Sequence, residues 1–181
     1  MEARLEKPGR SQVPLRPQQL LRVREARLAD LDAMARLLAS LFKQESDFSP
    51  SAAKQRRALE LILAQPSVGQ LFVITRGETV LGMVSLLFTI STAEGGKVAW
   101  LEDLVVRPDQ RGRGLGTRLL RAVVDWARRK GLARITLLTD ADNAGARRLY
   151  VRHGFSVSAM QPLRLHLGRK PHVRPLTLTL E

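Results

Sequence analysis

The fold is decided by the stretch LVVRPDQRGRGLGT, which spans residues 104–117. Its apolar start is typical of a buried strand, and Pro108 ends that strand because proline cannot continue the hydrogen-bond ladder. Glycine then occupies every second position from Gly112 to Gly116, and from Leu115 onward apolar side chains recur at helical spacing. The stretch therefore predicts a strand, a glycine-rich turn and the start of a helix.

The turn has the chemical character of an anion site. Glycines let a backbone approach a ligand closely, and the free N–H groups at a helix N-terminus favour anions. Arg111 and Arg113 add positive charge to these amides. The turn is not a P-loop, because no Gly-Lys-Ser/Thr occurs, and its glycines, spaced by two, do not match G-x-G-x-x-G. We interpret it as a cradle for phosphate or pyrophosphate, with an ordinary tight turn as the alternative.

Two motifs carry a resemblance to a known family. The pattern Arg111-x-x-Gly114-x-Gly116 resembles the acyl-CoA pyrophosphate motif of the GNAT superfamily of N-acyltransferases. The stretch NAGARRLYVRHGF, from Asn143 to Phe155, is similar to the family's N-x-x-A-x-x-L-Y-x-x-x-G-F. The motifs stand in the family's order and at its separation, and the resemblance covers residues 21–167.

The resemblance implies an N-acetyltransferase that uses acetyl-CoA as co-substrate and needs no metal. A primary amine of a polyamine, an amino acid, a similar small molecule or a peptide would attack the thioester directly in a ternary complex. A backbone N–H near residues 104–106 would stabilise the oxyanion. The residues expected to bind CoA are Leu104, Val105, Val106, Arg111, Gly112, Arg113, Gly114, Leu115, Gly116, Thr117, Asn143, Arg147 and Tyr150. The alternative is a non-catalytic acyl-CoA- or nucleic-acid-binding module on the same scaffold.

Two carboxylates on the strand before the turn are candidate general bases. A lysine-like amine with a pKa of about 10.4 needs roughly 4.6 kcal/mol to lose its proton at pH 7, so a base would help. Strand alternation places Glu102 and Asp103 on opposite faces, so only one of them would face a given site. The sequence WLEDL, residues 100–104, resembles the Leu-Glu-Asp of polyamine and related histone acetyltransferases, which implicate the glutamate. We therefore choose Glu102, and the alternative for either residue is an ion pair with a nearby arginine.

Tyr150, the only tyrosine, occupies the family's general-acid position. Proton transfer from a tyrosine of pKa about 10 to a thiol of pKa about 8.5 is uphill by roughly 2 kcal/mol, so we expect a hydrogen bond to the leaving sulfur. The alternative is an aromatic side chain packed on the core beside Leu149. Asn143 has two compatible interpretations, as a CoA contact and as a helix N-cap. We expect His153 to complement a helix dipole rather than to catalyse.

The acceptor is the least determined part of the prediction. Glu45 and Asp47 could hold a second ammonium of a diamine, and an ordinary polar loop is the favoured alternative. The net charge of +13 argues against a strongly cationic acceptor.

Composition limits the class of protein. A chain of 181 residues is long enough for one domain with a core, and its lack of cysteine excludes disulfides and a thiolate nucleophile. The three histidines lack metal-ligand spacing, and no apolar run reaches the roughly 18 residues of a membrane span. We expect a cytoplasmic protein that forms a homodimer. Its positive charge we assign mostly to solvated surface, without a specific nucleic-acid partner, because aromatic residues are few.

The resemblance and the hydrophobic pattern together predict an α/β (α+β) fold. A GNAT-like fold has a mixed, mostly antiparallel twisted sheet of roughly six or seven strands, a parallel pair at its centre and about four flanking helices. We expect a flexible tail at 1–20, the acetyltransferase domain at 21–168 and an extension at 169–181 that forms an extra edge strand or a dimer arm. Asp30 is expected to cap the first helix, and strands are expected at 21–26, 71–74, 80–87, 98–107, 135–139, 155–159, 163–167 and 176–180.

Overall fold

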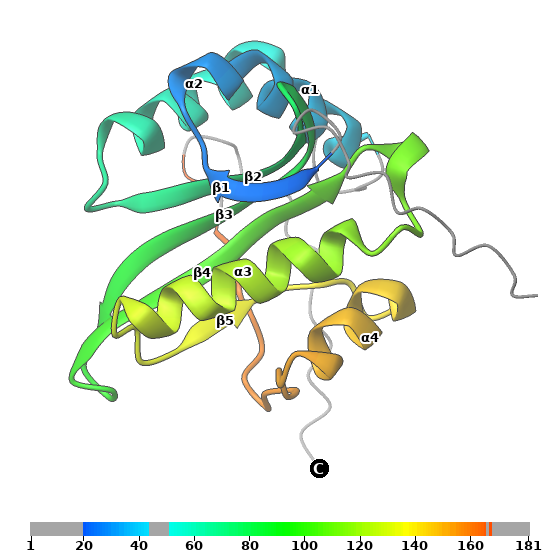
Figure 1. Ribbon diagram of the computed structural model, residues 1–181. Helices are drawn as coiled ribbons and strands as arrows, with labels where there is room; N and C mark the ends of the chain where they lie inside the picture. Colours follow the sequence, from blue (N-terminus) through cyan, green and yellow to red (C-terminus); the bar gives the residue numbers. More distant parts are fainter. Residues whose placement is uncertain (1–19, 44–50, 166, 168–181) are drawn as a thin grey trace, which may run out of the picture.

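The computed structural model describes residues 20–43, 51–165 and 167 (Figure 1). The elements follow one another as β1 (Leu21–Glu25), η2 (Leu28–Asp30), α1 (Leu31–Phe42), α2 (Ala52–Ala64), β2 (Gly69–Arg76), β3 (Thr79–Ser91), β4 (Gly96–Val106), η3 (Pro108–Gln110), α3 (Leu115–Arg129), β5 (Ile135–Leu137) and α4 (Ala144–Arg152). Within this part of the chain, no helix has the length and apolar character needed to cross a bilayer.

The strands form one sheet in the order β1-β2-β3-β4-β5. Neighbours from β1 to β4 run antiparallel, and β5 pairs with β4 in parallel, Trp100 lying opposite Thr136. A strand-helix-strand crossover through α3 produces this parallel pair, as the sequence predicts. The predicted fold, a mixed and mostly antiparallel sheet flanked by helices, is confirmed.

Helices cover both faces of the sheet, which explains why β2 and β3 read as continuous apolar runs (Figure 1). Alternate side chains of β2 enter two different cores. Phe72 and Ile74 pack toward α3 with Leu119 and Val123, whereas Leu71 and Val73 pack with the buried side chains of α1 and α2. The strand before the glycine-rich turn, β4, is likewise held from both sides, because Leu101 lies in the first core and Val105 in the second.

Two expectations about strands are wrong. The sheet has five strands rather than six or seven, and β5 ends it in the described chain, so the parallel pair lies at one side rather than at the centre. Residues 155–159 and 163–165 belong to no strand; Phe155 is partly buried, but Val157 and Leu163 are exposed by 82% and 88%. Alternation alone does not make a strand, because a strand needs a partner for its backbone groups. The strand expected at 176–180 lies outside the described residues.

Asp30 occupies the N-cap position of α1, as expected, but its side chain does not cap that helix. It ends the short helix η2, where its carboxylate accepts the backbone N–H of Arg27 at 2.7 Å, and its side chain makes no cap bond to α1. Two hydrogen bonds of 2.7 and 2.9 Å from the Arg24 guanidinium complete its contacts. A buried carboxylate with a bidentate arginine thus joins β1 to the start of α1.

Candidate functional site

The glycine-rich turn lies between η3 and α3 and has the backbone geometry that its sequence predicts. Gly112 and Gly114 have φ of 74° and 75°, in the left-handed region that favours glycine, and Gly114 is the N-cap of α3. The first backbone hydrogen bond of the helix runs from Arg118 N–H to the Gly114 carbonyl at 3.1 Å. The N–H groups of residues 115–117 therefore have no partner within the helix, which makes this end a suitable anion site.

Several side chains around the turn form hydrogen bonds or ion pairs with neighbouring residues. Arg111 Nε donates to the Val106 carbonyl at 3.3 Å, which ties the turn back to the end of β4. Asp109 is paired with Arg107 at 2.9 Å and accepts from Gln110, so its negative charge is compensated beside the turn. Gln110 Oε1 is a buried acceptor without a partner in the part of the chain that the structure describes. Because Arg107 compensates the charge of Asp109, Arg111 and Arg113 leave the turn with a net positive charge.

The two motifs of the sequence meet in space, because α4 packs against the start of α3. A Cβ added to Gly116 would lie 3.6 Å from Cδ2 of Leu149, ordinary van der Waals contact. Leu149 precedes Tyr150, so the chain's only tyrosine is carried on a helix that touches the cradle. The structure therefore brings Leu149 close to Gly116, although the rest of α3 and all of β5 separate them in the sequence.

Tyr150 is half-buried against the α3 core, its ring 5.8 Å from that of Phe155 in an edge-on arrangement. Burial raises the pKa of its hydroxyl above the ordinary value. Tyr150 therefore packs on the core, which was the alternative to a catalytic role. Its hydroxyl is protonated at neutral pH.

Asn143 caps α4, as predicted: its Oδ1 accepts the backbone N–H of Ala146 at 3.0 Å. Arg147 donates to the Ala141 carbonyl at 3.0 Å and so binds the loop that precedes the helix. His153, at the end of α4, has its Nδ1 2.8 Å from the Leu149 carbonyl. A CoA contact by Asn143 or Arg147 remains a prediction.

The strand β4 carries a bulge that the sequence analysis missed. Ser85 lies opposite Glu102 and Met83 opposite Val105, so Asp103 and Leu104 both stand against the single residue Val84. Asp103 has a φ of 54°, a left-handed conformation that aspartate adopts more readily than most residues. A bulge interrupts the strict alternation of side chains at this point of the strand.

The expectation that Glu102 and Asp103 lie on opposite faces is therefore wrong. The Asp103 carboxylate is 3.1 Å from the hydroxyl of Ser85, which is the residue paired directly with Glu102. Asp103 has Ser85 as its partner in the described chain, rather than an arginine. Both carboxyl groups thus belong to one site at the bulge.

Both carboxyl groups have raised pKa values. Partial desolvation is the main cause of the raised pKa of Glu102, which as a whole residue is exposed; the charge of Asp103 also raises this pKa, and that of Arg164 lowers it. Burial also raises the pKa of Asp103, against a hydrogen bond from Ser85. A raised carboxyl pKa brings such a group closer to the range in which it works as a base at neutral pH.

An exposed aromatic side chain shares the sheet face of Glu102. Trp100 precedes Glu102 by two residues, lies opposite Leu87 on β3 and is 39% exposed. A tryptophan in a strand normally indicates core, so its exposure could not be read from the sequence. The acceptor residues that we considered, Glu45 and Asp47, lie outside the described residues.

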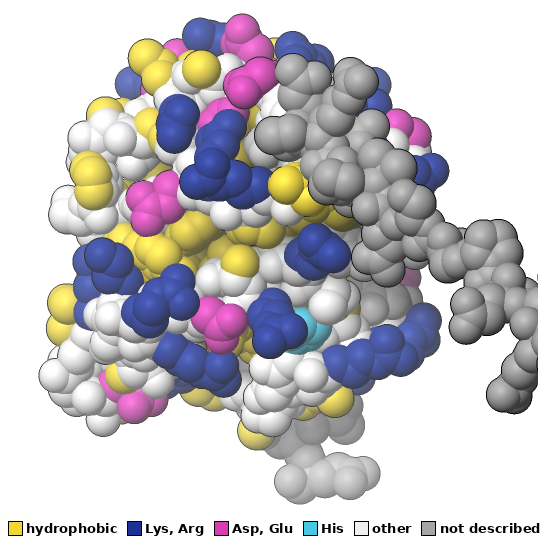
Figure 2. Space-filling model, in the orientation of Figure 1, with side chains coloured by type: hydrophobic (Ala, Val, Ile, Leu, Met, Phe, Trp, Pro, Cys, Tyr) yellow, Lys and Arg dark blue, Asp and Glu magenta, His cyan; other side chains and the backbone are white. Residues whose placement is uncertain are grey.

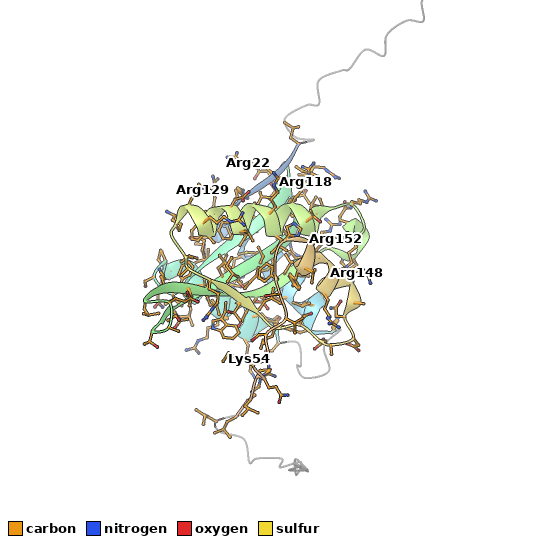
Figure 3. All side chains as sticks on the ribbon, turned by 90° about the horizontal axis from the view of Figure 1, so that it is seen from below. Arg22, Lys54, Arg118, Arg129, Arg148 and Arg152 are labelled. Atoms are coloured by element: carbon orange, nitrogen blue, oxygen red, sulfur yellow. The ribbon has the colours of Figure 1, made fainter. Side chains whose placement is uncertain are left out.

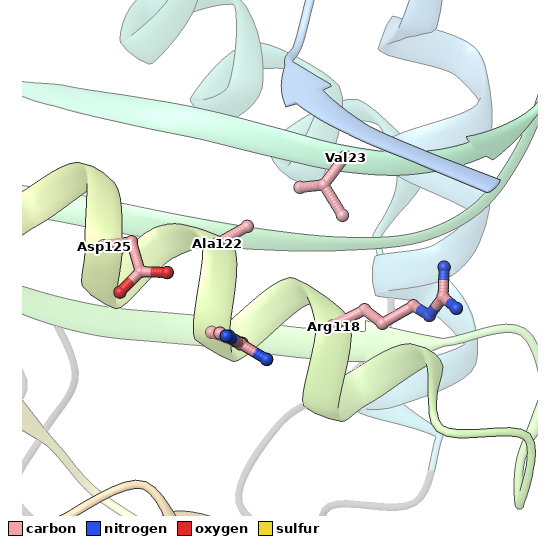
Figure 4. Close-up of a pocket in the computed structure, with 5 residues that line it drawn as sticks. Val23, Arg118, Ala122 and Asp125 are labelled. Carbon is pink, nitrogen blue, oxygen red and sulfur yellow. The ribbon is translucent and has the colours of Figure 1, made fainter.

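A shallow hollow of about 420 Å³ lies between β1 and the middle of α3 (Figure 4). It is lined by Val23, Arg118, Arg121, Ala122 and Asp125. It contains none of the predicted site residues, so the cradle is an exposed turn beside this hollow rather than part of it.

Several Lys and Arg side chains lie over α3 and α4, interspersed with polar, apolar and acidic side chains (Figure 2). Arg118 and Arg129 extend from α3, and Arg148 and Arg152 from α4 (Figure 3); all four residues are exposed. The interpretation of the net charge as mostly solvated surface stays a prediction.

The chain is similar in sequence and fold to known proteins. The Acetyltransferase (GNAT) family pattern matches residues 31–155. Aminoalkylphosphonate N-acetyltransferase of Salmonella typhimurium is 29% identical over 136 residues, 75% of this chain and 85% of that protein. Thialysine N-epsilon-acetyltransferase of Mus musculus is 30% identical over 141 residues, 71% of this chain and 80% of that protein. A predicted acetyltransferase of Clostridium acetobutylicum, solved with acetyl-CoA, superposes with a TM-score of 0.66 at 17% identity, over 82% of this chain and 97% of that one.

Proposed function

Because the chain belongs to the GNAT acetyltransferase family, we propose that it transfers the acetyl group of acetyl-CoA to a primary amine of a small molecule. The observation that carries the proposal is the position of Leu149, which packs on the core beside the start of α3 and so brings the helix of Tyr150 next to the anion cradle. An anion cradle, a carboxylate that could act as a base and a tyrosine hydroxyl that could donate a hydrogen bond would each assist acyl transfer to an amine.

The cradle suits the diphosphate of CoA. Backbone N–H groups of residues 115–117 offer hydrogen bonds to its oxygens, and Arg111 and Arg113 supply compensating charge. Acetyl-CoA supplies the activated thioester when bound. The backbone of residues 104–106, at the bulge, would place an N–H donor against the developing oxyanion.

Glu102 is the proposed general base. The amine must be neutral to attack, and Glu102 would take its proton, directly or through a water. Its raised pKa makes it a better match for this task than an ordinary carboxylate. Asp103 would act through its charge, which raises the pKa of Glu102, and through the bulge that it forms with Leu104.

Tyr150 is proposed to donate a hydrogen bond to the leaving sulfur. Burial raises its pKa, so full proton transfer to a thiolate is even less favourable than the roughly 2 kcal/mol for an ordinary tyrosine. A hydrogen bond that strengthens as charge grows on sulfur lowers the barrier without such a transfer.

The acceptor that we favour is a small amine that also carries an acidic group. Two relatives are named for acceptors of this kind, an aminoalkylphosphonate and thialysine. The net charge of +13, and the charge of Arg164 acting on Glu102, favour such a molecule over a polyamine.

A thiol-release assay with acetyl-CoA tests the proposal. The panel would contain aminoethylphosphonate, thialysine, other amino acids, spermidine and a lysine peptide. We expect turnover with at least one amine that carries an acid, faster than with spermidine. If calorimetry shows that CoA binds but no amine of the panel is acetylated, the proposed acetyltransferase activity is wrong and the non-catalytic module is favoured.

A further inference from the structure

Trp100 and the proposed base Glu102 stand on one face of β4. Both precede the bulge, where the pairing with β3 is regular: Trp100 lies opposite Leu87, and Glu102 lies opposite Ser85. Because side chains alternate along a strand, residues two apart share a face, and their Cα atoms are separated by roughly 7 Å. One small molecule can therefore contact the indole and the carboxylate together.

This face of the sheet is open at Trp100. Leu101, which points the other way, is buried in the core against α3, whereas Trp100 and Glu102 are exposed. On its second side Trp100 lies opposite Thr136 of β5, and Leu138, just past the end of β5, is 55% exposed. The surface beside Glu102 thus contains exposed apolar groups, as the lining of a small-molecule site does.

The exposed part of the Trp100 indole is not used within the protein. In the part of the chain that the structure describes, this ring makes no aromatic stacking, cation–π contact or hydrogen bond. Trp126 differs, because it packs on Phe72 and Phe88 and its Nε1 donates to Glu25. Of the chain's two tryptophans, the one beside the proposed base is therefore the one with aromatic surface left for a ligand.

We propose that Trp100 determines which amines are acetylated, by packing against an aromatic or large apolar group of the acceptor. The inference rests on the proposed function, in which the acceptor's ammonium meets the Glu102 carboxylate. A ring stacked on the indole forms an aromatic pair, and the charge-assisted contact at Glu102 fixes the nitrogen. The acceptor class is an arylalkyl amine, whose short alkyl chain spans the roughly 7 Å between the two residues.

A second ammonium is a poorer occupant of the indole face. Cation–π contacts do bring ammonium groups to tryptophan, so a diamine would also fit the geometry. A diamine, however, carries two positive charges to a protein whose own net charge is +13. An aromatic amino acid combines the ring and the amine with the acidic group favoured above, so phenylalanine is the probe.

Phenylalanine and alanine, which differ by the ring alone, measure the effect of Trp100 on kcat/KM with acetyl-CoA. The wild type should prefer phenylalanine by about tenfold or more, the size of one apolar contact in a half-open site. Trp100→Thr, which keeps a strand-forming residue, should reduce this ratio to about two or less, and Trp100→Phe should retain most of it. Ile90→Ala, which removes an exposed apolar side chain from the other face of the sheet, should leave the ratio unchanged.

Fluorine NMR of protein labelled with 5-fluorotryptophan tests binding separately from turnover. Trp100→Phe assigns the two resonances, and CoA, which has no acetyl group to transfer, is kept at saturation. Phenylalanine should shift the Trp100 resonance saturably and leave that of Trp126 in place, because Trp126 packs on the core against α3. Alanine should bind about tenfold more weakly.

The outcomes separate the role of Trp100 from the acetyl transfer on which it rests. Equal kcat/KM for phenylalanine and alanine, or a preference that survives Trp100→Thr, would overturn the role of Trp100 and leave the acetyltransferase in place. A preference for lysine over phenylalanine that Trp100→Thr abolishes would overturn it too, because the indole would then receive a cation. A saturable Trp100 shift with phenylalanine, without turnover of any amine, would support the aromatic contact and overturn the acetyl transfer.

Discussion

The hydroxyl of Ser85 lies 3.1 Å from the carboxylate of Asp103 and 3.0 Å from the backbone carbonyl of Glu102. A hydroxyl has one hydrogen, so it cannot donate to both acceptors when Asp103 is ionised. A protonated Asp103 can itself donate to Ser85 Oγ, while Ser85 donates to the Glu102 carbonyl. Ser85 is only 1% exposed, so the two forms of Asp103 satisfy this buried network differently: the ionised carboxylate accepts the Ser85 hydroxyl, whereas the protonated acid can donate to it and leave the hydroxyl for the Glu102 carbonyl.

The unfolding free energy of Asp103→Asn, relative to that of wild type, should therefore be higher at neutral pH than in acid. An asparagine donates as the protonated acid does and tolerates the left-handed φ of 54°. Because the native pKa of Asp103 is raised, its contribution to stability is complete below the unfolded value of about 3.9 and is lost as pH rises through the native pKa.

Urea unfolding of Asp103→Asn and wild type, measured from pH 4 to pH 8, checks this prediction. The difference in unfolding free energy should grow in favour of asparagine up to the native pKa and then stay constant. Asp103→Ala, which removes the donor, serves as the control and should be less stable than Asp103→Asn throughout. A difference that is independent of pH would mean that Asp103 ionises normally.

Glu102→Gln should lower kcat/KM by about 100-fold and remove the acid limb of its pH profile. That limb should lie above the ordinary range of a glutamate, because burial and the Asp103 charge raise the pKa of Glu102. Activity falls as pH drops below this pKa, since the base must be ionised. In Asp103→Asn the limb should persist and move to lower pH, and loss of the limb there would instead make Asp103 the base.

Tyr150→Phe should lower kcat by about 10- to 100-fold, the effect of one hydrogen bond to a growing charge, and leave CoA affinity nearly unchanged. The phenyl ring keeps the packing against Phe155, so unfolding free energy should change little. Steady-state kinetics and calorimetry with CoA measure the two effects separately. A normal turnover number would remove Tyr150 from the mechanism.

The cradle was predictable because its requirements are local. Glycine at residues 112 and 114 is needed for a left-handed backbone, and proline at 108 ends a strand, whatever the rest of the fold does. Asn143 likewise caps the helix that its sequence motif opens. Each of these signals concerns residues that are close in the chain.

The features that the sequence did not reveal depend on pairing between distant strands. The bulge at Asp103 arises because β3 has one residue, and β4 two, between the pairs Met83–Val105 and Ser85–Glu102. The sequence of β4 alone contains no pattern that predicts it. The exposure of Trp100 and the unpaired residues 155–159 depend equally on what lies beside them. Side-chain alternation gave the wrong answer for Glu102 and Asp103 for this reason.

Asp30→Asn should destabilise the fold by about 2–4 kcal/mol at pH 7, because it leaves the Arg24 guanidinium without its buried partner. The hydrogen bond from Arg24 holds the pKa of Asp30 below its ordinary value. The stability that it contributes is therefore present above the unfolded pKa of about 3.9 and is lost as pH falls through the native pKa. Urea unfolding at pH 7 and pH 3 measures the loss, and Asp32→Asn, at an exposed position, should show little of it.

Gly114→Ala and Gly131→Ala form a matched pair that separates backbone strain from ligand binding. The two glycines have φ of 75° and 70°, at opposite ends of α3, and an added Cβ meets nothing within 4 Å at either position. Each substitution should therefore destabilise the fold by a similar amount, about 1–2 kcal/mol, through the left-handed backbone alone. Only Gly114→Ala changes the turn that presents the N–H groups of residues 115–117, so only this variant should weaken CoA binding, by about tenfold or more in calorimetry. Equal CoA affinity in the two variants, at equal loss of stability, would show that the cradle does not hold the diphosphate.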